Sequence, residues 1–200
     1  MTWENLNVLS ETLNKTGLQL TLTGKLHSKQ YWLLDNRTLN GHHGYDLLAV
    51  MTPQGSEQSI LVNFGWIAQG ISRELLPQTQ LPEKTLTISV QLKQGDLAGF
   101  YLDGAEKTGS EWPKLIQFID IEEQAKQSEV KLVNYMAYAV VTNDFAQPHY
   151  EPVVMPPQKH VAYALQWLLI AFAATVVFIF AMRSQYRNQR VVATANEINK

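Results

Sequence analysis

The feature that most constrains this chain is an apolar stretch near its C-terminus. Residues 161–182 contain no Asp, Glu, Lys or Arg over 22 positions. An α-helix rises about 1.5 Å per residue, so this stretch would be roughly 33 Å long, close to the roughly 30 Å hydrocarbon core of a bilayer. Residues 161–182 are therefore predicted to form a transmembrane helix surrounded by membrane lipid.

The charges on either side of this span predict its orientation. Three arginines lie in residues 183–190, whereas Lys159 is the only Lys or Arg between Lys131 and the span. Positive charge concentrates on the cytoplasmic side of membrane helices. We therefore expect residues 183–200 to form a basic cytoplasmic tail and residues 1–150 to form an extracytoplasmic domain.

The domain of residues 1–150 has the pattern of a mainly β fold. Apolar and polar side chains alternate in Leu18–Leu26 and in Leu86–Leu92, as in half-buried strands. The density of short strands and turns predicts a small antiparallel sheet or open β-barrel with a short helix at residues 121–128. Further strands are predicted at residues 31–36, 45–52, 60–67, 116–120 and 137–142.

Composition narrows the classes of partner and chemistry. The net charge of −2 provides no basic field, so nucleic acid is not an expected partner. The chain has no cysteine, which excludes disulfides, thiolate metal sites and a cysteine nucleophile. Residues 151–160 begin with the proline-rich run EPVVMPPQ, which predicts a stiff link between the domain and the span.

No common catalytic motif is present, and an enzyme is not expected. The sequence lacks the HExxH, GxSxG and P-loop patterns. His42 and His43 are adjacent in the glycine-flanked run NGHHG, where a metal site and a solvated turn are the two alternatives. The turn is favoured because no third ligand is indicated.

The N-terminus raises a question of export. Residues 1–17 lack the basic and apolar regions of a secretory signal. Two explanations remain open at this point: a cytoplasmic domain held by a tail anchor, or an additional membrane helix upstream of Met1. The charge asymmetry around the span favours the second explanation.

Two blocks of the sequence resemble the surfeit locus protein one (SURF-one) family, membrane proteins that assist assembly of cytochrome c oxidase. One block lies in the domain and the other opens the span, in the order and spacing typical of the family, over roughly residues 18 to 185. The domain matches are Asn36, Arg37, Gly44, Tyr45, Thr52, Pro53, Leu61, Val62, Asn63, Gly65 and Trp66. Those at the span are His160, Tyr163, Ala164, Gln166 and Trp167.

The sequence also departs from the family pattern. Phe64 stands where members usually have arginine, and Ala68 where they usually have proline. Any role that depends on that arginine is therefore in doubt for this chain. Members also have a first membrane helix before the soluble domain, and this chain lacks it. A helix upstream of Met1, the second explanation for export, would supply it.

The resemblance implies a role for the start of the span. In bacterial members the histidine that matches His160 is implicated in haem a binding, with His160 as iron ligand and Tyr163 and Trp167 beside the ring. The alternative is an interfacial histidine bonded to headgroups or backbone. Lys159 has two alternative roles: it is a candidate partner for a haem propionate, or it is an interfacial lysine whose ammonium group extends to the headgroups. A stripe with small residues suggests packing against another helix; it comprises His160, Ala164, Trp167, Ala171, Ala174 and Phe178.

Together these observations predict a non-enzymatic, chaperone-like assembly factor for haem-copper cytochrome c oxidase. The expected location is the bacterial inner membrane, with the β-domain on the periplasmic side. The expected task is to assist haem a insertion or to stabilise subunit I, which receives the haem, with the haem a synthesis machinery as a further candidate partner. The alternative is a membrane-anchored interaction module that has no cofactor.

Overall fold

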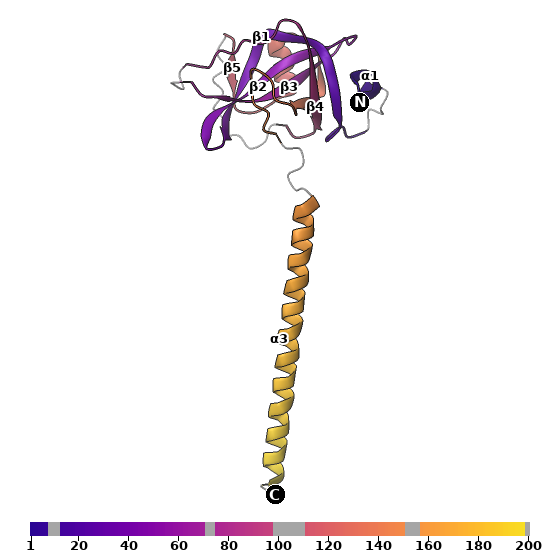
Figure 1. Cartoon of the computed structure of the whole chain (residues 1–200), viewed down its shortest axis with the longest axis vertical. Coiled ribbons are helices and arrows are strands. Elements are labelled where there is room, and N and C mark those ends of the chain that lie inside the picture. The colour runs from indigo at the N-terminus through magenta and orange to yellow at the C-terminus, as the bar shows by residue number, and fades with distance from the viewer. Residues whose placement is uncertain (8–12, 71–74, 98–110, 151–156, 199–200) are drawn as a thin grey trace. The chain divides into compact units, whose positions relative to one another are not determined.

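The computed structural model describes residues 1–7, 13–70, 75–97, 111–150 and 157–198. It divides into two compact units, Met1–Pro152 and Val153–Lys200. The second unit consists of α3, Pro157–Ile198. The elements of the first unit are α1 (Trp3–Asn7), β1 (Gln19–Leu39), β2 (His42–Pro53), β3 (Ser59–Ala68), β4 (Thr85–Gln94), β5 (Lys114–Ile116), α2 (Ile121–Ser128) and β6 (Leu132–Ala139) (Figure 1).

The strands of the first unit form a β-barrel. Their order is β2, β3, β6, β4, β1 and β5, and β1 also pairs with β2, so five of the six strands close on one another. The predicted mainly β fold is confirmed; of the two predicted forms, a small antiparallel sheet or an open barrel, the structure is nearer the second, but the barrel is closed. Two pairings, β3 with β6 and β1 with β5, are parallel, which the alternating patterns alone did not indicate.

A tight hairpin joins β1 to β2 and sets their register. Asn40 and Gly41 have φ values of 51° and 81°, the left-handed conformation that a two-residue hairpin turn requires. Leu39 then pairs with His42. An Asn-Gly pair adopts these angles at low cost because glycine has no Cβ and asparagine tolerates the region.

The apolar residues form two clusters, one on each face of the barrel wall. Leu22, Leu47 and Phe64 belong to the first cluster, which fills the interior. The second covers the outer face of β2 and β3; its buried members are Trp32, Leu34, Leu48, Val50, Leu61, Ile116, Ile119, Met136 and Tyr138. Because β2 and β3 are buried on both faces, their sequences are continuous apolar runs rather than alternating ones.

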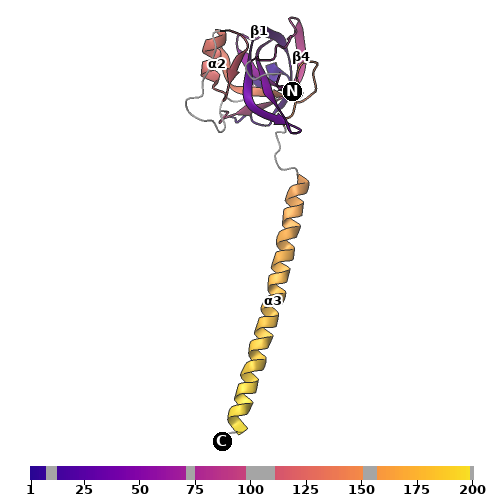
Figure 2. The ribbon, with the colours of Figure 1, turned by 90° about the vertical axis from the view of Figure 1, so that its left-hand side faces the viewer.

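The helix α2 covers part of the outer face, as Figure 2 shows. Its bounds are those predicted from the sequence. The side chain of Asp120 accepts hydrogen bonds from the backbone N–H groups of Glu122 and Glu123 and so caps the helix. Trp32 of β1 donates its indole N–H to Gln127 at 2.7 Å, which ties the helix to the barrel.

Three predicted strands have different bounds in the structure. Residues 31–36 continue β1 instead of forming a separate strand. The strand expected at 116–120 ends at Ile116, because Asp120 is used as the cap of α2. The strand expected at 137–142 lies earlier, at Leu132–Ala139, and Val141 is exposed beyond its end.

The second unit is a single helix whose apolar side chains are exposed. It contains one stretch, Lys159–Arg183, that is long and apolar enough to cross a membrane, with a mean hydropathy of 2.3. The helix begins at Pro157, within the predicted link of residues 151–160, and continues through most of the predicted tail. Residues 151–156 of that link lie outside the described part of the chain.

Candidate functional site

Three polar side chains lie next to one another on the outer face of the barrel. Asp46 of β2, Asn63 of β3 and Tyr138 of β6 each stand between neighbours whose side chains fill the interior, so their own side chains point outward. Asn63 and Tyr138 are directly paired across β3 and β6. All three are buried, although two of them are polar residues that ordinarily prefer the surface.

Asp46 is the centre of a polar network. Only 5% of this residue is exposed, so its carboxylate needs protein partners in place of water. Asn63 donates its side-chain N–H to Oδ2 at 3.0 Å, and Arg37 places Nε 3.7 Å from the same oxygen. The other oxygen, Oδ1, lies 2.5 Å from Nε2 of His149. Both carboxylate oxygens are therefore engaged.

His149 belongs to a segment that returns over the barrel after β6. We call residues 143–150 the strap. The backbones of Trp66 and Gln147 exchange two hydrogen bonds, of 2.7 and 2.8 Å. The Asn143 side chain donates to the Phe64 carbonyl at 3.2 Å. The strap is thereby attached to β3 at two points and to β2 through His149.

Gly65 allows the strap to approach β3 closely. Its φ of 116° is unfavourable for other residues, and a Cβ there would lie 2.3 Å from the carbonyl oxygen of Gln147. The pairing of β2 with β3 also shifts at this point, because Leu47 faces Gly65 and Leu48 faces Asn63. A bulge and a close backbone approach therefore coincide at this glycine.

Aromatic stacking joins the end of the strap to β6. The ring of Tyr150 stacks on Tyr138 with centroids 3.7 Å apart, and the ammonium of Lys93 lies 5.9 Å from the centroid of Tyr150. Burial raises the pKa of Tyr138, and the neighbouring Tyr150 and the Asp46 carboxylate raise it further. The Tyr138 phenol therefore keeps its proton at neutral pH.

Part of the domain block of the resemblance lies at this site. Asn63 belongs to the network, Gly65 to the attachment of the strap, and Arg37 pairs with the carboxylate of Asp46. The indole of Trp66 lies over Gly44, since a Cβ on that glycine would be 2.4 Å from Trp66 Nε1. The fold thus gathers residues that are separated by up to 29 positions between Arg37 and Trp66.

The geometry of the network favours holding a segment over catalysis. Asp46 and His149 form a carboxylate–imidazole pair, the arrangement that orients a base in hydrolases. Among the described residues, however, His149 has no hydrogen bond from a serine or threonine hydroxyl. What the structure shows for this pair is that it connects the strap to β2.

The two departures from the family pattern lie on β3. Phe64 is fully buried in the barrel interior, where its ring packs against Phe145 of the strap with centroids 5.2 Å apart. An apolar side chain suits that interior position. Ala68, in contrast, is exposed at the end of β3.

The predicted residues of the membrane helix lie on one side of α3. His160, Tyr163 and Trp167 are three and four positions apart, a spacing that places them on one helix face, and all are exposed. In the described part of the chain, His160 has no hydrogen bond or ion pair, so both ring nitrogens are free to bind a ligand. These properties fit an axial haem ligand. The assignment of these residues to haem a stays a prediction.

The histidine pair of the β1–β2 hairpin occupies an exposed position. Both His42 and His43 open β2 next to the turn. Across the described ranges, no group of three or more His, Cys, Asp or Glu residues comes close enough to hold a metal ion. The pair thus has no ligand partners there.

A comparison with protein families matches residues 3–172 to the SURF1 family. The match covers most of the chain, including the barrel, the strap and the first half of the apolar helix. The chain belongs to the SURF1 family. This is a family of assembly factors, and it is linked to the assembly of cytochrome c oxidase. No individual curated protein matched the chain.

Sequence reasoning missed three residues of the network, Asp46, Tyr138 and His149. One signal was available, since Asp46 is a charged residue inside the apolar run YDLLAVM. A carboxylate in a buried strand requires a partner. That partner, His149, is 103 positions away, and no local pattern indicates it.

Proposed function

We propose that this SURF1 family member assists haem a insertion into cytochrome c oxidase or stabilises subunit I, which receives the haem. In this proposal α3 anchors the protein in a bacterial inner membrane, with the barrel on the periplasmic side and the C-terminal end in the cytoplasm. The protein holds its cargo or partner and makes no bond itself. The family match and the apolar helix support the proposal.

The observation that carries the proposal is that several of the family's domain residues, among them Arg37, Asn63, Gly65 and Trp66, lie where the strap attaches to the barrel. The strap is the last described segment of the barrel unit before α3 along the chain. Asp46, Asn63 and Gly65 fix its position through hydrogen bonds and a close backbone approach. This network therefore determines where the chain leaves the barrel toward the membrane helix.

His160 is the proposed ligand of haem a, which is cargo in this scheme. Its imidazole is exposed near the start of the apolar stretch and has no protein partner among the described residues. Tyr163 and Trp167, on the same face, offer aromatic surface to a flat ring. A haem held there would have its apolar tail in lipid.

Haem retention tests the ligand. The protein is produced in cells that synthesise haem a, purified in a mild detergent, and analysed for haem by its absorption spectrum and by extraction. We expect His160→Ala to lose most of the bound haem. The control is His42→Ala, which removes an exposed histidine from the barrel and should retain haem. Equal haem in all three proteins would refute the assignment of His160.

Oxidase assembly tests the wider role. In a strain that lacks the gene, we expect fewer assembled oxidase complexes and less haem a per subunit I than in the parent. The unaltered gene should restore both quantities, and Asp46→Ala should restore them only in part. Normal assembly in the deletion strain would favour the alternative, an anchored interaction module with no cofactor.

A further inference from the structure

A pocket lies where β1 changes its neighbouring strand. β1 pairs with β4 as far as Lys25 and with β5 from Trp32 onward. Its pairing with β2 passes directly from Leu26 to Tyr31, so residues 27–30 have no paired residue in any of these strands. A depression of about 600 Å³ opens at this gap, a size typical of small-molecule sites.

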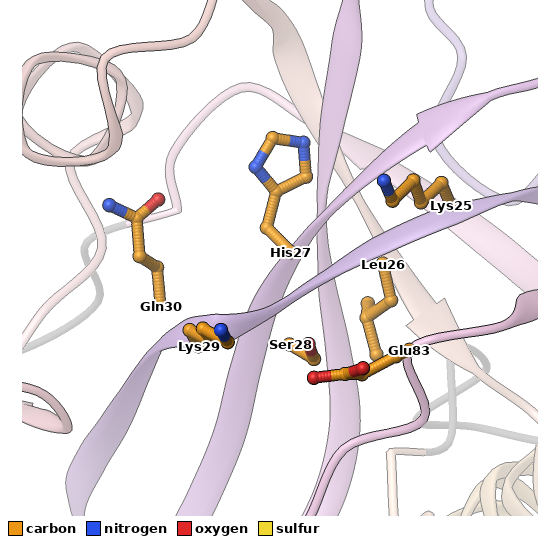
Figure 3. A pocket seen from close by; sticks show the side chains of 7 residues that line it. All are labelled: Lys25, Leu26, His27, Ser28, Lys29, Gln30 and Glu83. Atoms are coloured by element: carbon orange, nitrogen blue, oxygen red, sulfur yellow. The ribbon is translucent and has the colours of Figure 1, made fainter.

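The lining of this pocket is rich in hydrogen-bond donors and positive charge. Six of its seven residues, Lys25–Gln30, follow one another along β1, and Glu83 comes from the segment before β4 (Figure 3). In a regular strand, residues four positions apart are about 13 Å apart. Lys25 precedes the four unpaired residues and Lys29 is one of them, and both line the pocket.

The charges in the pocket are not neutralised by ion pairs. Lys25, Lys29 and Glu83 form no ion pair with any described residue. The pocket is thus lined by two lysines and one glutamate whose charges have no ion-pair partner there, and the hydroxyl of Ser28 and the amide of Gln30 add neutral donors. An anion bound in the pocket would be attracted by both lysines.

His27 is held in a fixed position on the same wall. Its Nε2 lies 3.0 Å from the Thr52 hydroxyl, which in turn lies 2.8 Å from the Ser59 hydroxyl. The other ring nitrogen has no partner in the described part of the chain. Burial lowers the pKa of His27, and the charge of Lys25 lowers it further, so the ring is neutral at neutral pH and one nitrogen can donate.

We propose that this pocket binds a phosphate group, with Lys25 and Lys29 as its charged partners. Two ammonium groups match the charge of a phosphate better than that of a single carboxylate. Ser28 and Gln30 supply hydrogen bonds to the phosphate oxygens. The phosphate belongs either to a soluble small molecule or to a phospholipid headgroup. This inference is independent of the proposed function.

Lysine labelling tests the site in the intact chain. The protein in a nonionic detergent is treated with an amine-reactive reagent, with inorganic phosphate or with sodium chloride at equal ionic strength, and labelling rates are measured by mass spectrometry. At phosphate concentrations ten times the dissociation constant, Lys25 and Lys29 should be labelled about tenfold more slowly. Lys126, exposed on α2, and Lys131, exposed just before β6, serve as controls in the same molecule.

The same measurement distinguishes the two sources of phosphate. The protein is also placed in nanodiscs of phosphatidylglycerol, in a buffer without inorganic phosphate. Slower labelling of Lys25 and Lys29 there than in detergent would identify a lipid headgroup as the ligand. Protection by inorganic phosphate alone would identify a soluble ligand. If neither preparation protects these lysines more than Lys126 and Lys131, the site does not exist.

A pair of charge-matched variants provides a second test. Lys25→Gln/Lys29→Gln and Lys126→Gln/Lys131→Gln lose the same net charge, so a general electrostatic effect would weaken phosphate binding equally in both. Calorimetric titration with inorganic phosphate should show at least a tenfold weaker affinity only in the pocket variant. Equal affinities in the two variants would overturn the proposal.

Discussion

The barrel and α3 use the same kinds of residue in opposite ways. Phe64 in the barrel is 0% exposed, whereas Phe172 on α3 is 70% exposed and Trp167 is 68% exposed. Burial of an aromatic side chain is favourable in both cases, but the barrel provides the apolar surroundings itself. An exposed apolar surface as long as that of α3 requires another apolar medium, and lipid provides it in the proposed setting.

The two regions also differ in how their polar side chains are hydrogen-bonded. The barrel buries Asp46, Asn63 and Gln124 because hydrogen bonds within the fold replace those to water. In the apolar stretch of α3, the hydroxyl of Thr175 donates to the backbone carbonyl of Ala171 at 2.8 Å, so it is satisfied within the helix. The barrel can therefore support a polar site that depends on tertiary contacts.

The largest expected effect is the difference between the same substitution, Phe to Ala, made in the barrel and in α3. Phe64→Ala should destabilise the barrel by about 3–5 kcal/mol because it leaves a cavity in a closed core. Phe172→Ala should leave the barrel's unfolding unchanged, since this residue belongs to the other unit and its side chain is exposed. Chemical unfolding followed by near-ultraviolet circular dichroism measures both values. Equal effects would contradict the separation of the two units.

A charge placed in the apolar stretch tests the medium around α3. Ala174→Arg should reduce membrane insertion by about 2.5–3.5 kcal/mol, the cost of arginine at the centre of a membrane helix. The fraction of chain that resists carbonate extraction from membranes measures this effect. Gln54→Arg, at an exposed turn of the barrel, is the control and should insert normally.

The network at Asp46 should show an intermediate and local effect. Asp46→Ala leaves the buried donor of Asn63 unpaired and releases His149, at a cost of about 1–3 kcal/mol. Hydrogen exchange at the amides of Trp66 and Gln147 should accelerate more than exchange in the barrel interior. Asp96→Ala, at an exposed turn, is the matched control. Uniform acceleration would mean that the network stabilises the whole barrel rather than the strap.

The smallest expected effect is a pH dependence from His27. Its pKa in the folded chain lies below the ordinary value of 6.5, so the unfolded chain binds the proton first as the pH falls. Protonation of this histidine therefore lowers the free energy of unfolding below about pH 6.5 and does not change it above that pH. In phosphate-free buffer, the stability of His27→Gln relative to the natural protein should rise as the pH falls below 6.5. A pH-independent difference would contradict the lowered pKa.

Local patterns predicted much of the fold. The alternation in β1 and β4 identified strands, and the bounds of α2 were predicted at both ends because Asp120 is a strong helix cap. Two strands were placed wrongly by several residues, β5 and β6. Their apolar runs continue past the strand ends, and tertiary packing rather than local preference decides where pairing stops.

Of the candidate site, only the residues that belong to the matched sequence blocks could be predicted. The resemblance identified Arg37, Asn63, Gly65 and Trp66, but not the carboxylate with which Arg37 pairs. The identity of that partner depends on the register of β2, because a shift of one residue would turn Asp46 into the interior.

The sequence by itself determined the apolar helix, the mainly β character of the domain and the family, since each is written in local spacing and composition. Only the tertiary structure decided that the barrel closes and that His149 reaches Asp46 across 103 positions. It also decided that Lys25 and Lys29 share a pocket. The physical reason is that hydrogen bonds and charge pairs act over a few ångströms in space, whereas sequence patterns describe only neighbours along the chain.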